Sequence, residues 1–211
     1  MKRWLFILTA SGVLSFIIGF IFGPVILQSN GSSPRESQVQ WVSAASTIAE
    51  LTAEADAIVR AKVGSAYQTR AIIIPLPTDG VGNRPRFDVV PFTDRELLVT
   101  AVYKGNVAVD DEITIMQTGG ELAATQQRPA VKHEIHDDPL FVENGDHILF
   151  LKDISGDSVH APGRQLYRIV NPAGRYDVQA KGIRTNAELS SASLPSSIDV
   201  LMDQLNEALN Q

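Results

Sequence analysis

The pattern of hydrophobic and polar residues changes character along the chain, and each change marks a predicted element. The first pattern is a continuous apolar run, Trp4–Leu27, without a charged residue. A helix of about 20 residues crosses the hydrocarbon core of a bilayer, so this run is long enough to span a membrane. Lys2 and Arg3 precede it, and positive residues favour the cytoplasmic side. The pattern predicts an uncleaved, single-pass signal anchor over residues 1–28, with the remainder outside the cell membrane.

A cleaved signal peptide is the alternative interpretation of this segment. Its apolar region would span roughly 7 to 15 residues, with small residues at the cleavage site directly after it. The apolar run here is longer, and a polar segment, QSNGSSPRES, follows it; the nearest small-residue stretch is Val42–Ser46. Residues 29–45 are predicted to form a flexible linker because Ser, Asn, Gly and Gln dominate this region.

Short segments with strand-like alternation replace the apolar run after residue 46. Thr47 and Glu50 form a capping-box pattern, which predicts a short helix ending near Asp56. The predicted strands are Ala57–Val63, Asp94–Gly105, Glu112–Thr118, Asp146–Lys152, Gln165–Asn171 and Arg175–Gln179. Two stretches are predicted to be long irregular loops: Tyr67–Thr93, which contains four prolines, and Glu121–Pro139.

Helices are predicted only at the two ends of this part. The C-terminal helix has an apolar stripe and a serine cap, formed by Ile198, Leu201, Leu205, Leu209 and Ser196 or Ser197. Several short strands between two terminal helices favour a mainly β fold, a small OB-like β-barrel, over a βαβ fold. The predicted extracytoplasmic domain covers residues 46–211.

Cysteine content and charge narrow the possible functions. The chain has no cysteine, which excludes disulfides, thiol nucleophiles and thiolate metal sites. Many bacterial cell-surface domains lack disulfides, so a bacterial source is expected. The part after Arg35 carries a net charge of about minus nine. Such a field repels phosphate backbones, and no nucleic-acid partner is expected.

Several motifs resemble a group of uncharacterised bacterial exported domains. They are EADAIVRAKV, a strand ending in VYKG, ITIMQTGG, DPLFVENGDHILFLK and NPAGRYDV, within about Glu50–Val178. In outline this group is similar to the OB-type barrel of the tissue inhibitors of metalloproteinases and of the netrin module. The resemblance implies an OB-like barrel. It does not imply protease inhibition, because those inhibitors reach a protease zinc through an N-terminal cysteine.

Residues of metal-binding type gather in one stretch, KHEIHDDPLF. His133, His136, Asp137 and Asp138 are the candidate ligands. A zinc-protease helix carries H-E-x-x-H, whereas the order here is H-E-x-H in a predicted loop. A solvated polar loop is the simpler interpretation. No nucleophile elbow, dinucleotide motif or phosphate loop occurs, so neither catalytic residues nor a cofactor is predicted.

A second unusual stretch, AIIIPLP, places Ile72, Ile73 and Ile74 in a proline-rich region. These isoleucines pack on their own domain or remain exposed. If they are exposed, they are the candidate contact surface for a protein partner, since contiguous exposed apolar patches mark such surfaces. Close to a membrane they are also suited to touch lipid.

The sequence therefore leads to one main hypothesis and two alternatives. The main hypothesis is a membrane-anchored, extracytoplasmic, non-catalytic binding or assembly module of unknown ligand. The first alternative is a metal-binding cell-surface protein or metal-dependent hydrolase using the loop from His133 to Asp138. The second is a passive spacer in a membrane complex assembled through Gly19 and Gly23, which are spaced for close helix contact.

Overall fold

The computed structural model describes residues 35–37, 43–76, 86–126, 129–180, 182–185 and 194–211. The chain divides into two units, Met1–Gly31 and Ser32–Gln211. The predicted anchor over residues 1–28, with Gly19 and Gly23, lies outside the described residues. Within the described ranges, no helix is both long enough and apolar enough to cross a membrane.

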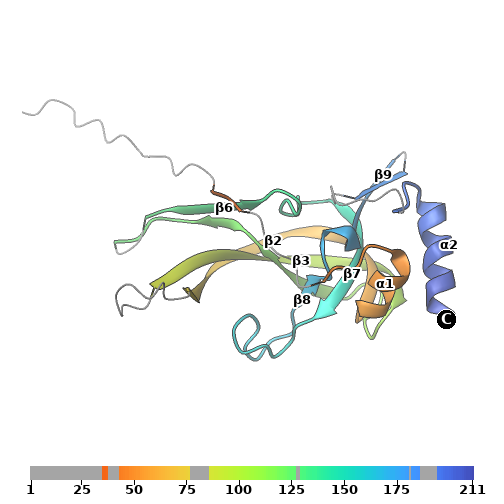
Figure 1. The fold of residues 1–211 in the computed structure, drawn as a ribbon, viewed down its shortest axis with the longest axis horizontal. Helices are drawn as coiled ribbons and strands as arrows, with labels where there is room; N and C mark the ends of the chain where they lie inside the picture. The colour runs from red at the N-terminus through yellow and green to blue at the C-terminus, as the bar shows by residue number, and fades with distance from the viewer. Residues whose placement is uncertain (1–34, 38–42, 77–85, 127–128, 181, 186–193) are drawn as a thin grey trace, which may run out of the picture. The chain divides into compact units, whose positions relative to one another are not determined.

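The described part is mainly β, with a large sheet, one helix before its strands in the sequence and one after them (Figure 1). The strands are β1 (Arg35–Ser37), β2 (Ala57–Leu76), β3 (Arg86–Lys104), β4 (Glu112–Thr118), β5 (Gly120–Leu122), β6 (Val131–Ile135), β7 (Asp146–Asp153), β8 (Tyr167–Ile169), β9 (Arg175–Gln179) and β10 (Gly182–Thr185). The helices are α1 (Ile48–Glu54), η2 (Pro172–Gly174) and α2 (Ile198–Leu209). Each of the predicted strands has a counterpart, and both predicted helices are confirmed.

The strands form two sheets. Seven strands pair in the order β10-β9-β7-β2-β3-β4-β8, and three pair in the order β1-β6-β5. The large sheet curls, because β8 also pairs antiparallel with β7. Its pairing with β4 is parallel and consists of one residue pair, Ile115 and Tyr167. A single pair is not a continuous ladder, so the sheet does not form a closed barrel.

Alternate residues of the central strands enter two different cores. Val59 of β2 and Leu149 of β7 belong to a cluster enclosed by the strands, which also contains Leu97 of β3. We call this side of the strands the inner face. Their neighbours Ile58 and Phe150 point the other way and pack with the helices. This is the period-two alternation of a strand, here with both faces buried near the helices.

Helices α1 and α2 lie next to each other at one end of the large sheet (Figure 1). Leu51 of α1 and Leu201 and Leu205 of α2 are fully buried in the same cluster. The capping box at the start of α1 is confirmed: the Glu50 backbone N–H donates to Thr47 Oγ1 at 3.2 Å, and the Thr47 N–H donates to Glu50 Oε2 at 3.1 Å.

The Lys104–Gly105 pair holds the other end of α1. Lys104 Nζ donates to the backbone oxygens of Thr52, at 2.6 Å, and Ala55, at 2.7 Å, where the last turn of the helix lacks backbone donors. Gly105 has φ 100°, and a Cβ atom there would lie 2.6 Å from the oxygen of Asp56. Only glycine fits this position without displacing backbone, so the VYKG motif has a structural role.

The prediction of an irregular loop over Tyr67–Thr93 is wrong for most of this stretch. Strands β2 and β3 extend into it and pair with each other as far as Leu76 and Arg86. Its prolines are accommodated near one end of the ladder: Pro75 lies opposite Phe87 and Pro91 opposite Ala71. Among the described pairings, β2 has a second neighbour only up to Lys62. A missing backbone donor is tolerated on a strand with an open edge. We call Ala71–Leu76 with Arg86–Pro91 the β2–β3 arm.

The predicted loop Glu121–Pro139 is also wrong in part. It contains β6 and most of β5, which pair antiparallel from Gly120–His133 to Leu122–Val131. The predicted linker likewise contains β1, which pairs parallel with β6. These strands are short and carry few apolar residues, so their alternation is too weak to identify from the sequence.

Candidate functional site

A buried polar cluster occupies the inner face close to the arm. Four of its members are buried: Gln117 of β4, Asp138, His147 of β7 and Arg175 of β9. The fifth, Asp177 of β9, is partly exposed. The register explains how they meet: His147 lies opposite Asp177, and Gln117 lies opposite Thr93 of β3. All four strand residues therefore extend from the same face of the curled sheet.

Asp138 is the most deeply buried carboxylate of this cluster, with 2% of its surface exposed. It accepts hydrogen bonds from Gln117 Nε2 at 3.0 Å and Arg175 Nη1 at 3.3 Å. Burial raises the pKa of Asp138 to about 6, although the positive charge of Arg175 acts in the opposite direction. The Arg175 guanidinium also lies 4.1 Å above the ring of Phe141. This contact fixes the segment that connects Asp138 to β7.

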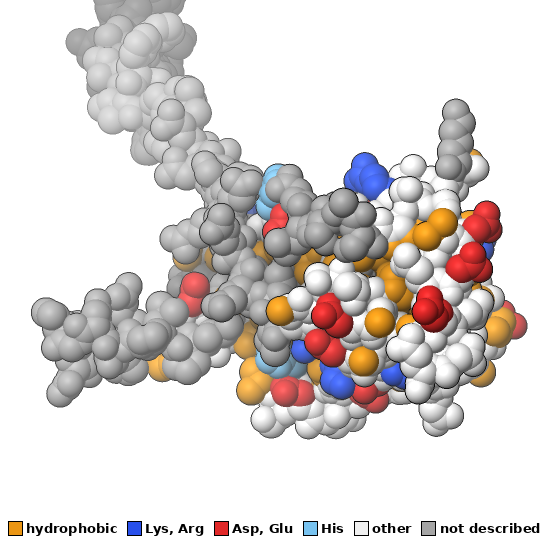
Figure 2. All heavy atoms as spheres, turned by 45° about the vertical axis from the view of Figure 1, so that its right-hand side comes forward, with side chains coloured by type: hydrophobic (Ala, Val, Ile, Leu, Met, Phe, Trp, Pro, Cys, Tyr) orange, Lys and Arg blue, Asp and Glu red, His pale blue; other side chains and the backbone are white. Residues whose placement is uncertain are grey.

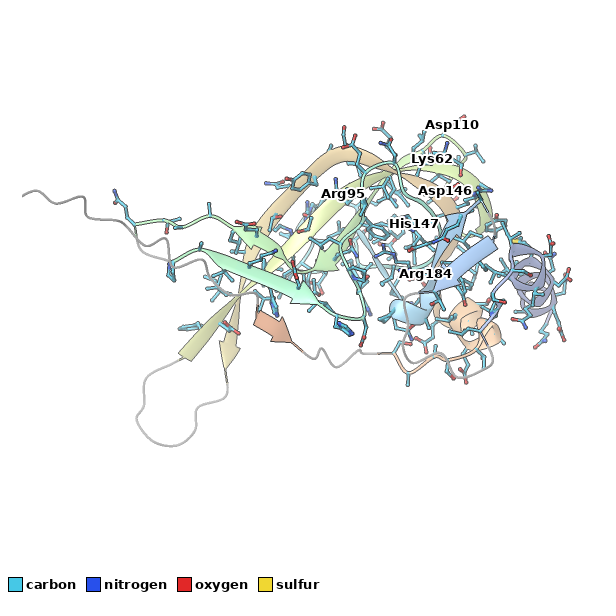
Figure 3. All side chains as sticks on the ribbon, turned by 90° about the horizontal axis from the view of Figure 1, so that it is seen from above. Lys62, Arg95, Asp110, Asp146, His147 and Arg184 are labelled. Carbon is cyan, nitrogen blue, oxygen red and sulfur yellow. The ribbon has the colours of Figure 1, made fainter. Side chains whose placement is uncertain are left out.

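His147 and Asp177 form an imidazole–carboxylate pair beside Asp138, with 2.8 Å between His147 Nδ1 and Asp177 Oδ1. Burial acts to raise the pKa of Asp177, but the His147 hydrogen bond and the Arg175 charge outweigh it, so the pKa is lowered. His147 Nε2 is buried and has no hydrogen-bond partner within the described part of the chain. Figure 3 shows His147 among the strands, whereas Asp110 lies on a peripheral loop.

The position of His147 Nε2 argues against a catalytic role for this pair. A Cβ atom on Gly145 would lie 2.6 Å from Nε2, so the glycine provides the space that the ring occupies. His147 is 4% exposed and does not line the pocket described below. A general base must reach the proton that it removes. In this arrangement the hydrogen bond between His147 and Asp177 joins β7 to β9.

A pocket of about 620 Å³ lies over the polar cluster. Its lining residues are Thr118, His133, Glu134, Ile135, His136, Pro139 and Leu140. Pro139 connects the two features, because its backbone oxygen accepts hydrogen bonds from Arg175 Nη1 at 2.5 Å and Gln117 Nε2 at 3.3 Å. The buried cluster thus fixes one wall of the pocket.

The predicted metal ligands are divided between this pocket and the interior. His133, on β6, and His136 both line the pocket. Asp138 instead bonds to Arg175 and Gln117, and Asp137 does not line the pocket. No group of three or more His, Cys, Asp or Glu side chains suited to a metal ion occurs among the described residues.

The predicted partner residues are divided by the alternation of β2. Ile72 is 6% exposed and packs with Phe92 and Met116, whereas Ile73 is 64% exposed. Ile74 also belongs to β2, but its side chain lies outside the described residues. Three consecutive isoleucines in a strand cannot all face one side, so only part of the predicted patch is available for contact.

The sequence did not reveal that residues of β3 extend this exposed surface. Phe87 is 57% exposed, and Val89 lies directly opposite Ile73. We call Ile73, Phe87 and Val89 the arm face. It continues the inner face, because Phe87 and Val89 alternate in step with Leu97 along β3. Nearer the cluster the same face is covered, and Thr93 donates a hydrogen bond to the Gly119 oxygen at 2.8 Å.

Two further motifs behind the family resemblance have local structural roles. Asn171 of NPAG accepts from the Ala173 N–H at 2.9 Å and donates to the Ala45 oxygen at 2.8 Å, joining η2 to the segment before α1. Asn144 of ENGD has φ 65°, as its predicted tight turn requires.

Comparison of the chain with known proteins gave no matching family model, no matching curated protein and no matching solved structure.

Proposed function

We propose that this protein is a membrane-anchored, extracytoplasmic, non-catalytic module that binds a protein partner through the arm face. The apolar run Trp4–Leu27 and the preceding Lys2 and Arg3 support the anchor and its orientation. The observation that carries the binding role is the exposure of Ile73 and Phe87 on one side of the β2–β3 arm. Apolar patches held exposed on an ordered strand pair mark contact surfaces.

We also propose that the curled sheet is an OB-like barrel of the partly open kind. Support comes from the neighbour relations β2-β3-β4-β8 together with the pairings of β7 to both β2 and β8. An OB fold has five strands in a partly open Greek-key barrel and uses its loops and one face for binding. In this proposal the arm is an extended hairpin of the barrel, which separates the contact surface from the core.

The chemistry of the arm face favours an apolar protein segment as its partner. Ile73 and Phe87 offer aliphatic and aromatic surface, and Val89 between them is partly buried. Burying apolar surface contributes roughly 25 cal/mol per Å², so removing two large side chains from water supplies useful binding energy. Aromatic residues at the centre of an interface often dominate its affinity.

A site-specific photo-crosslinker at Ile73 tests this proposal in cells that produce the full chain. The matched control carries the same crosslinker at Val109, which is 53% exposed in the turn between β3 and β4. We expect a discrete adduct at position 73 and none at 109, with the partner identified by mass spectrometry. Phe87→Asp should weaken binding of the purified pair at least tenfold. Equal labelling at both positions, or unchanged affinity of the Asp variant, would contradict the proposal.

The localisation is tested separately, with a C-terminal alkaline phosphatase fusion in bacterial cells. This reporter is active only outside the cytoplasm. We expect high activity from the complete chain and its loss when residues 1–28 are removed. High activity from the shortened chain would show that the segment is not the export signal.

A further inference from the structure

Two arginines share one buried carboxylate on the opposite side of the arm base. Arg70 of β2 binds Asp94 of β3 with two hydrogen bonds, Nε to Oδ2 at 2.8 Å and Nη2 to Oδ1 at 3.3 Å. Arg164, from the connection between β7 and β8, donates from Nη2 to Asp94 Oδ2 at 2.5 Å. Asp94 is 4% exposed. We call these three residues the arginine pair site.

The charges of this site do not balance. Two guanidinium groups, which remain protonated in proteins, face one carboxylate, so one positive charge is left over. Among the described residues, no acceptor is found for Nη1 of Arg70 or for Nε and Nη1 of Arg164. The nearby Asp157 is engaged elsewhere, by the His160 ring at 3.0 Å and by backbone N–H groups of the same turn.

The surroundings of the two arginines leave the excess positive charge accessible from one side. The site rests on an apolar cluster that includes Phe92, Met116 and Leu166, which limits access of water from below. The side chains of Arg70 and Arg164 are nevertheless 21% and 37% exposed, so a ligand can reach them from solvent. The rest of the domain is acidic, and Figure 2 shows acidic side chains spread over one of its faces. On such a surface, the two guanidinium groups form a local positive site to which an anion can bind.

We propose that the arginine pair site binds an oxyanion, such as a phosphate or carboxylate group, between Arg70 and Arg164. The planar guanidinium group suits oxyanions because its N–H donors match the spacing of their oxygens. Asp94 holds the two arginines in place, and the remaining donors meet the ligand. This function is independent of the arm face, which lies on the other side of the same strands.

The test is a thermal unfolding series on the full-length chain in detergent. Sodium phosphate, sulfate, acetate and succinate are each titrated at constant ionic strength, with chloride as the reference. A ligand that binds only the folded state raises the melting temperature in a saturable way. We expect such a rise with at least one oxyanion. A response limited to phosphate and sulfate indicates a tetrahedral ligand group, and a response to acetate and succinate indicates a carboxylate.

Substitution assigns the effect to the site. Arg164→Gln should weaken the response at least tenfold, whereas Arg168→Gln should leave it unchanged. Arg168 is a suitable control because its guanidinium donates, among the described residues, to nearby backbone oxygens at 3.4 Å and to no carboxylate. If Arg164→Gln fails to fold, Arg164→Lys keeps the charge, loses the planar fork and should bind at least threefold more weakly than wild type. Absence of a saturable response in wild type, or equal responses in wild type and the Arg164 variant, overturns the proposal.

Discussion

The buried polar cluster and the arginine pair site use the same chemistry for different ends. In each, a carboxylate that is almost fully buried accepts hydrogen bonds from arginine: Asp138 from Arg175, and Asp94 from Arg70 and Arg164. Arg175 is 3% exposed and lies between two carboxylates, Asp138 and Asp177. The arginine pair site has the reverse ratio, with two partly exposed guanidinium groups for one carboxylate.

This difference shows which charged groups serve the fold and which are available to a ligand. An enclosed arrangement with its donors directed at protein acceptors fixes local structure, and removing one partner leaves a buried charge uncompensated. In the arginine pair site, by contrast, one positive charge and several N–H donors lack a partner among the described residues, so a ligand can bind to them. Hydrogen-bond accounting thus separates the two groups, although both consist of ordinary Asp–Arg pairs.

The largest effect is expected for Arg175→Met. This change leaves Asp138 buried without its cationic partner, and breaking a buried pair costs about 3–5 kcal/mol of unfolding free energy. Urea denaturation measures the loss. The double variant Arg175→Met with Asp138→Leu should recover part of it, since position 138 then carries no buried carboxylate, while Asp177 keeps its hydrogen bond to His147. If Arg175→Met costs less than about 1 kcal/mol, the cluster is not a structural element, and the comparison fails.

A smaller effect is expected from the titration of Asp138. Its pKa in the folded protein is about 6, above the ordinary value of 3.8. The folded state therefore holds this proton more tightly, and the resulting stability is fully present below about pH 4 and is lost as the pH rises through 6. Between these limits, the unfolding free energy of wild type should fall relative to Asp138→Asn by on the order of 1–3 kcal/mol.

Urea denaturation of both proteins at several pH values from 4 to 7 checks this expectation. The lowered pKa of Asp177 acts in the opposite sense, because it stabilises the fold as the pH rises. Asp177 is present in both wild type and Asp138→Asn, so its contribution largely cancels when their unfolding free energies are subtracted. A difference between the two proteins that is constant with pH would show that Asp138 does not titrate in this range.

The smallest effect on stability is expected for Arg164→Gln. Arg70 continues to hold Asp94 with two hydrogen bonds, and Arg164 is partly solvated. The expected loss is within about 1 kcal/mol in anion-free buffer, as for other partly exposed ion pairs. A loss comparable to that of Arg175→Met would assign the arginine pair to the fold and remove the contrast between the two groups.

The sequence predicted the elements whose signals are local. The capping box of Thr47 and Glu50 and the alternation of Glu112–Thr118 lie within a few residues, and both are confirmed. The arm was missed because its prolines resemble loop residues, although Pro75 occupies a position of β2 with an open edge and Pro91 lies directly before the first residue of the β3–β4 ladder. Its exposed residue Phe87 was missed for the same reason.

Neither charged group was visible in the sequence, for a different reason. Gln117 and Arg175 meet across strands that are far apart in the chain, and Arg164 reaches Asp94 from a distant connection. Such contacts depend on strand register, which short motifs do not reveal. The KHEIHDD motif attracted attention through its histidines, whereas the residue with the clearest structural role is Asp138.

The packing of α1 against α2 has a consequence for the folding of the protein during its synthesis. Ribosomes complete α1 early and α2 only at the end of the described sequence, yet Leu51, Leu201 and Leu205 share one core. Until α2 has been synthesised, the apolar side of α1 in the nascent chain lacks the residues of α2 that bury it. Holding factors and quality-control proteases recognise such exposed surface. We therefore expect a chain that ends before α2 to be degraded rather than to form a shorter stable domain.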